Sequence, residues 1–173
     1  MSTLSNVEFL KILGRGTYTL LIFVSDNICL KIGRLGIVDF NEGLYSYTGS
    51  ALGVSNLSLY YRVSRHLKKN KKFRWHIDYL LNSKLTRALA VVAASSKKRF
   101  ECKVSRKLLH SPFLVSYIPM FGSSDCNCPS HLHYFGKIKL NIILRELMRI
   151  YVELGLHPVS ILLCEPDLIE FSY

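Results

Sequence analysis

The stretch that decides the fold is GTYTLLIFV at residues 16–24, taken together with YSYTG at residues 45–49. Both are rich in aromatic and β-branched residues, so each predicts a β-strand. Tyr45 and Tyr47 alternate with polar residues and should share one face of their strand. Ile28–Ile32 follows the first stretch after Ser-Asp-Asn, which predicts a hairpin. These segments together indicate an antiparallel meander of about three strands.

Helical periodicity starts near Asn56, downstream of the meander. Four helices are expected: one from Asn56, Trp75–Leu81, one capped by Ser95 or Ser96 that runs to Leu109, and Asn141–Leu154. Further strands are expected at Leu89–Ala94, Val115–Ile118, 131–135 and Val159–Cys164. The pattern predicts an α+β protein: a small mixed, mainly antiparallel sheet flanked by helices, with a C-terminal helix–strand extension.

The composition is typical of a globular protein. The chain has 173 residues, of which 49% are apolar, and it contains ten Tyr and nine Phe, which excludes a disordered or low-complexity chain. Its longest apolar stretch, near Leu20–Val24, is far shorter than the ~18 residues that a membrane span needs. Five cysteines, three of them isolated, favour reduced thiols over a disulfide framework. We therefore expect a soluble, cytoplasmic protein that binds no membrane.

Positive charge is concentrated in the middle of the chain. Residues 43–139 contain seventeen Lys and Arg but only three Asp and Glu. At helical spacing Arg62, Arg65, His66 and Lys69 gather on one side, which we expect to be a basic surface opposite an apolar one. Such a surface attracts polyanions, of which nucleic acid is the commonest. The candidate binding residues are Arg65, Lys68, Lys69, Lys71, Lys72 and Arg74. The alternative is a solvated basic surface without a ligand.

Four short patterns follow one another in a characteristic order: Gly16-Thr17-Tyr18, Tyr47-Thr48-Gly49, Arg62-x-x-x-His66 and Glu101. This order resembles the GIY-YIG nuclease superfamily. The stretches YSYTGSALG, YYRVSRHLKK, WHIDYLL, FECKVSRKLL and FGSSDCNCPSHLHYF are similar to an archaeal branch of that superfamily, which is catalogued as a domain of unknown function. Relatives in that branch are sometimes fused to a DNA-repair glycosylase. The resemblance covers residues 8–136, so we expect a nuclease-like domain at 1–136 and an extension at 137–173 packed on or beside it.

The resemblance implies a catalytic set of Tyr18, Tyr47, Arg62, His66 and Glu101. Tyr47, Tyr18 or His66 would activate water, while Arg62 would stabilise charge on the phosphate. Glu101 would hold one Mg²⁺ or Mn²⁺. Each group also has a structural interpretation. The tyrosines could fill a half-buried sheet, the arginine and histidine could belong to a solvated face, and Glu101 could simply favour a helix N-terminus.

The sequence departs from the superfamily pattern in four ways. Thr replaces the central Ile of each tripeptide, which should be harmless on a strand. About 28 residues separate Tyr18 from Tyr47, so we expect an inserted strand pair between them. Ser50 stands where the superfamily often has a lysine, which removes a phosphate contact. An asparagine that commonly closes the cleft has no clear counterpart, although Ser123, Ser124 and Asp125 lie where it could be replaced.

A second group of residues has zinc-ligand chemistry: Cys126, Cys128, His131 and His133. Their spacing is tighter than in usual zinc motifs. The alternative is reduced loop cysteines beside core histidines, and the tight spacing favours it.

These observations leave three functional hypotheses. The first is a metal-dependent endonuclease in DNA processing or repair, with DNA favoured over RNA as its substrate. The second is a non-catalytic nucleic-acid-binding module with a GIY-YIG-like fold. The third is an assembly protein whose C-terminal extension docks on a protein partner, the basic surface being incidental.

Overall fold

A computed structural model describes residues 7–55 and 58–164, and it has the expected α+β architecture. One six-stranded sheet has the order β6-β7-β4-β1-β5-β8, and all of its strand pairs are antiparallel. Its strands are β1 (Gly16–Val24), β4 (Gly43–Ala51), β5 (Thr86–Ser95), β6 (Ser116–Tyr117), β7 (Leu132–Tyr134) and β8 (Val159–Leu162). The helices are η1 (Val7–Phe9), α2 (Leu10–Leu13), η2 (Gly33–Leu35), α3 (Leu59–Leu67), α4 (His76–Asn82), α5 (Glu101–Leu108) and α6 (Leu140–Glu153). None of the described helices is long and apolar enough to cross a membrane.

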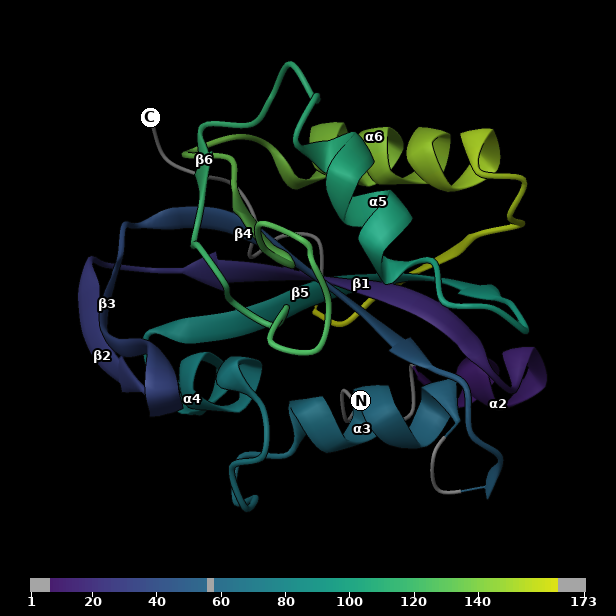
Figure 1. The fold of residues 1–173 in the computed structure, drawn as a ribbon, viewed down its shortest axis with the longest axis horizontal. Coiled ribbons are helices and arrows are strands. Elements are labelled where there is room, and N and C mark those ends of the chain that lie inside the picture. The colour runs from purple at the N-terminus through teal and green to yellow at the C-terminus, as the bar shows by residue number, and fades with distance from the viewer. Residues whose placement is uncertain (1–6, 56–57, 165–173) are drawn as a thin grey trace.

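Helices cover both faces of the sheet, and each face has its own apolar core (Figure 1). Tyr18, Leu20 and Ile22 of β1 pack with residues of α3 and α4. Leu21 belongs to the opposite core, which α5 and α6 complete. A strand that is buried on both faces needs apolar residues at successive positions, which explains the continuous apolar run in β1.

The inserted strand pair predicted between the two tyrosines is present. β2 (Ile28–Ile32) and β3 (Gly36–Phe40) pair with each other and form a separate two-stranded sheet. The predicted hairpin between the first two strands is therefore wrong. β1 is already paired on both sides, with β4 and β5, so it has no free edge for β2.

The C-terminal helix and strand also lie where the sequence predicted them. α6 packs over the second core, and the Tyr151 hydroxyl lies 2.9 Å from Oγ1 of Thr19 on β1. β8 pairs with the outer edge of β5. The described part of the predicted extension therefore packs directly on the remainder of the chain.

The start of α5 differs from its prediction. Ser95 does not cap this helix, because it still belongs to β5 and pairs with Gly16. The helix begins at Glu101, after a short turn in which Ser96 binds the backbone of Lys98. The predicted helix start at Asn56 lies outside the described residues, and the described part of α3 begins at Leu59.

Candidate functional site

The two motif tyrosines lie side by side on neighbouring strands. β1 and β4 place Tyr18 opposite Gly49 and Leu20 opposite Tyr47. Both phenols point to the face that α3 covers, and both side chains are buried. A Cβ atom at Gly49 would lie 2.6 Å from the Tyr18 hydroxyl. Glycine at this position therefore leaves room for the phenol of Tyr18 to cross β4.

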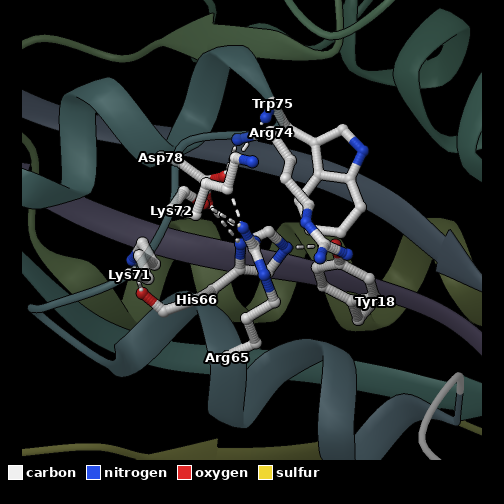
Figure 2. Close-up of polar contacts among 8 residues, drawn as sticks. All are labelled: Tyr18, Arg65, His66, Lys71, Lys72, Arg74, Trp75 and Asp78. Atoms are coloured by element: carbon white, nitrogen blue, oxygen red, sulfur yellow. Dashed lines mark hydrogen bonds and ion pairs between the residues drawn. The ribbon is translucent and has the colours of Figure 1, made fainter.

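Tyr18 is the first member of a buried polar chain that continues through His66 to Asp78 (Figure 2). The Tyr18 hydroxyl lies 2.7 Å from Nε2 of His66, and Nδ1 of His66 lies 3.6 Å from Oδ1 of Asp78. The contact with Asp78 is longer than a hydrogen bond, but an ionised carboxylate can only accept, so we assign the histidine proton to Nδ1, facing Asp78. Nε2 is then free to accept the proton of the Tyr18 hydroxyl.

Asp78 is fully buried, and several donors compensate its charge. Arg65 donates to both carboxylate oxygens at 3.0 Å, and the backbone N–H groups of Arg74 and Trp75 donate at 2.9 and 3.1 Å. Asp78 is also in the first turn of α4, where the helix dipole favours negative charge. No role was expected for this residue. Its signals in the sequence were its place in the stretch WHIDYLL and its isolation in a basic segment.

The ionisation of this chain follows from burial and from these contacts. Burial lowers the pKa of His66 to about 4, even though Asp78 favours its charged form. Burial alone would raise the pKa of Asp78, but its contacts with His66 and Arg65 and with the two backbone donors lower it below the ordinary value. Burial also raises the pKa of Tyr18 well above its ordinary value. At neutral pH the chain therefore consists of a protonated phenol, a neutral imidazole and a carboxylate.

The prediction that His66 lies on a solvent-facing basic side of its helix is wrong. Leu59, Val63 and His66 are spaced four and then three residues apart, so they share one face of α3, and all three are buried. Arg62 lies at the rim of this face, with its guanidinium 4.3 Å from the Trp75 ring centroid.

A pocket of about 390 Å³ opens beside the tyrosines. β7 pairs with Tyr45–Tyr47 of β4, and the pocket is lined by Tyr47 and by Gly49 and Ser50 farther along β4. Four of the predicted catalytic residues, Tyr18, Tyr47, Arg62 and Glu101, line this pocket, and His66 lies behind Tyr18. Its other lining residues are Gly49, Ser50, Leu52, Gly53, Trp75, Arg99, Gly122, Asp125 and His131.

Glu101 is the first residue of α5 and is mostly buried in the pocket wall. Ser50 donates a short hydrogen bond to its Oε2, and Arg99 lies 3.9 Å from its Oε1. Arg99 also lies 3.5 Å from Asp125, so one guanidinium bridges two carboxylates of the pocket. The pocket thus combines negative and positive groups within a small volume.

The predicted nucleic-acid-binding residues divide into two groups. Lys68, Lys72 and Arg74 are exposed, and so is Lys69. Arg65 is held by Asp78, whereas Lys71 and Lys69 donate to the backbone carbonyls of His66 and Leu81. Burial lowers the pKa of Lys71 to about 8. The exposed side chains can contact a ligand directly, whereas Arg65 is engaged in an ion pair that stabilises the fold.

A second cluster, Cys102, Cys126, Cys128 and His131, could hold a metal ion. Hereafter it is called the cysteine cluster. The prediction that His133 belongs to this set is wrong. His133 is buried under α5, with Nε2 3.4 Å from Oγ of Ser105, and Cys102 of α5 takes the fourth place. Local spacing could not reveal Cys102, although it directly follows Glu101, which was expected to face the site.

Comparison with known families shows the family to which the chain belongs. The model of a family described as a domain of unknown function, DUF123, matches residues 17–153. The chain belongs to this family. The DUF123 match begins in β1 and ends with the last residue of α6, so it contains the whole polar chain, the pocket and the cysteine cluster. No curated protein and no solved structure matches the sequence.

Proposed function

We propose that this DUF123 protein is a divalent-metal-dependent endonuclease of the GIY-YIG type, acting on DNA in processing or repair. The observation that carries the proposal is the convergence of five predicted residues on one pocket. Tyr18, Tyr47 and Arg62 line it together with Glu101, although they come from four separate elements, and His66 contacts Tyr18 from behind. A sheet filled only by structural tyrosines would not require an arginine and a carboxylate at the same cavity.

The polar chain supports a route for the proton of an attacking water. Water would give a proton to the Tyr18 oxygen while the hydroxyl proton of Tyr18 passes to Nε2 of His66. The imidazolium that results would be stabilised by the carboxylate of Asp78. Because the phenol is never a free phenolate in this route, the raised pKa of Tyr18 is no obstacle.

Charge on the phosphate would be met by the guanidinium of Arg62, which is held against Trp75 at the pocket wall. Tyr47 lies beside Tyr18 in the same wall and would position the water or the phosphate. His66 is neutral at pH 7, so Nε2 has a lone pair for the proton, and because burial lowers the pKa of His66 to about 4 the ring would hold that proton only transiently.

The residues present fit a hard divalent cation. Mg²⁺ is commonly bound by one or two carboxylates together with substrate phosphates and water. Glu101 offers one carboxylate in the pocket wall, and Asp125 offers a second carboxylate of the same pocket. When bound, Mg²⁺ or Mn²⁺ would supply charge neutralisation at the phosphate. Arg99 lies near both carboxylates, so at least one of its two ion pairs would have to break when the cation binds.

One observation favours the binding module instead. Ser50 and Arg99 already satisfy Glu101 without any cation, and Ser50 replaces a lysine that is frequent in the superfamily. A module with this pocket would bind a phosphate backbone through Arg62 and the exposed lysines but would leave it intact.

Cleavage assays separate the two functions. Labelled single-stranded, duplex and branched DNA should be incubated with the protein in Mn²⁺, Mg²⁺ or EDTA. We expect metal-dependent cleavage that Glu101→Gln abolishes while DNA binding persists, because only the charge that holds the cation is removed. Tyr47→Phe should slow the chemical step by about 10²-fold or more. Glu153→Gln on α6 and Tyr117→Phe on β6 are matched controls, since neither residue lines the pocket.

Two results would contradict the nuclease proposal. Wild-type rates in both pocket variants would show that cleavage occurs elsewhere. A wild-type protein that binds DNA with no cleavage of any of the three substrates would establish the binding module.

A further inference from the structure

The cysteine cluster brings together residues from three parts of the chain. Cys102 lies on α5, Cys126 and Cys128 lie in the connection between β6 and β7, and His131 directly precedes β7. Their ligand atoms, three Sγ and one imidazole nitrogen, all lie within 4.8 Å of one another. Cys128 and His131 are buried, while Cys102 and Cys126 are partly exposed.

We propose that the cysteine cluster is a structural Zn²⁺ site with three thiolate ligands and one imidazole ligand. In a tetrahedral site with Zn–S near 2.3 Å and Zn–N near 2.0–2.1 Å, a sulfur and a nitrogen lie about 3.6 Å apart. Sγ of Cys102 lies 3.7 Å and Sγ of Cys126 lies 3.5 Å from Nε2 of His131. The side chains are thus already spaced as ligands of one ion.

The chemistry of the set selects zinc over the cation expected in the pocket. Thiolate and imidazole are soft or borderline ligands, which zinc prefers, whereas Mg²⁺ and Mn²⁺ prefer carboxylate and water oxygens. The backbone of Gly122 is a hydrogen-bond partner of the His131 ring, and such an outer partner is usual for a metal-bound histidine. All three cysteines are free thiols in the structure. Binding Zn²⁺ would release their protons to solvent.

The connection that would gain most from the ion is long and irregular. Fourteen residues separate Tyr117 from Leu132, and they form neither helix nor strand. Connections of this length without secondary structure are uncommon in compact domains and are usually functional. Zinc would join this connection to the first turn of α5, in addition to the hydrogen bond that Ser105 of α5 donates to the Ser130 carbonyl and the ion pair between Arg99 and Asp125.

The site would also fix one wall of the pocket. Cys102 directly follows Glu101, Cys126 directly follows Asp125, and His131 itself lines the pocket. The ion would therefore hold both carboxylates in place without itself taking part in any reaction. This role does not depend on what the pocket binds, so the zinc site and the nuclease proposal can fail separately.

Metal content and thermal stability test the site without any nucleic acid. Protein purified in the absence of chelators should contain about one equivalent of zinc per chain by elemental analysis. A strong chelator should lower its melting temperature, and added Zn²⁺ should restore it. Replacement by Co²⁺ should give thiolate-to-metal absorption and the intense ligand-field bands of a tetrahedral site.

Variants identify the ligands. Cys102→Ser and Cys126→Ser should lose the zinc and most of the chelator-sensitive stability. Cys164→Ser, which changes a partly buried cysteine outside the cluster, should keep both, as should His133→Gln. If a serine variant fails to fold, the chelator and Co²⁺ measurements on the wild-type protein still decide. The proposal would be overturned if the purified protein contained no metal and its melting temperature changed with neither chelator nor added Zn²⁺. A disulfide within the cluster would also overturn it.

Discussion

His66 shows how burial sets the chemistry of a single residue. Its ring lies between the Tyr18 hydroxyl and the Asp78 carboxylate, and only 2% of the residue is exposed. A nearby carboxylate ordinarily stabilises imidazolium. Here Asp78 is already neutralised by Arg65 and two backbone donors, so desolvation dominates and the imidazole stays neutral. The burial that keeps His66 neutral also makes the fold sensitive to acid, because protonation of the ring is disfavoured in the folded state.

Stability should therefore fall between pH 6.5 and about 4 in a way that depends on His66. In the unfolded chain the histidine binds a proton near its ordinary pKa of 6.5, whereas in the fold it resists protonation until about pH 4. The free energy of unfolding should fall by up to about 3 kcal/mol across this window. His66→Gln, which cannot titrate, should lack this part of the fall. Urea unfolding at pH 7, 5.5 and 4.5 measures it, and an identical pH dependence in both proteins would contradict the argument.

His133 does not confuse that comparison. Burial lowers its pKa to about 3, so it contributes acid sensitivity of the same sign. Because it is present in both proteins, its contribution cancels in the difference between them.

At the residue scale, the sequence predicted the groups that a motif marks. Tyr18, Tyr47 and Glu101 were assigned to one site, and they line one pocket. Asp78 was missed because its role depends on how α4 packs against α3, and Cys102 was missed because its cluster partners lie in a loop far from it in sequence. The pair of glycines in the motif has a physical reason that only the structure gives. A Cβ at Gly49 would meet Tyr18, and one at Gly16 would lie 1.9 Å from the Ala94 carbonyl oxygen.

At the element scale, α3 and α4 are joined by one buried ion pair. Arg65 on α3 donates to both oxygens of Asp78 on α4 and to the Lys72 carbonyl in the turn between them. The guanidinium also lies 4.3 Å from the Trp75 ring centroid. One arginine thus sets the angle between the two helices and the shape of the turn.

Removing that arginine should cost much more stability than removing its lysine neighbour. Arg65→Ala would leave a fully buried carboxylate with its backbone donors and the neutral His66 ring, and breaking such a pair costs about 3 kcal/mol or more. Lys68→Ala removes an equal charge from an exposed side chain and should change stability by about 0.5 kcal/mol or less. Denaturant unfolding of both variants measures the difference. Equal, small effects would mean that the ion pair contributes little.

Element boundaries and pairings were only partly predictable from the sequence. Strong periodicity located the long helix α6, and a continuous apolar run located β5. The predicted pairing of Ile28–Ile32 with β1 was wrong. The local Ser-Asp-Asn turn favours a hairpin, but two longer strands, β4 and β5, occupy both edges of β1. Strand order depends on contacts between distant segments, which local patterns do not encode.

At the scale of the whole molecule, exposed basic residues lie on both helical layers, with Lys103, Arg106 and Lys107 of α5 on one layer and the turn after α3 on the other. The turn after α3 carries the exposed residues Lys68, Lys72 and Arg74 on the layer of α3 and α4. α6 lies on the opposite layer and pairs most of its charges internally, as in the contacts of Arg149 with Glu146 and Glu153 (Figure 1). We expect a phosphate backbone to lie on the layer of α3 and α4 because its exposed basic turn leads into the pocket wall formed by Arg62 and Trp75.

The salt dependence of DNA binding tests this placement. Lys68→Ala combined with Lys72→Ala should weaken binding and reduce the slope of log affinity against log salt concentration by about one to two units, because each lost phosphate contact releases about one fewer counterion. Lys139→Ala combined with Arg145→Ala removes the same charge from the exposed side of α6 and should leave the slope unchanged. Circular dichroism of both variants controls for folding. An equal fall in both would mean that net charge, and not a defined surface, governs affinity. If the wild-type protein shows no binding at low salt, its surface charge has no nucleic-acid ligand, and the assembly hypothesis takes precedence.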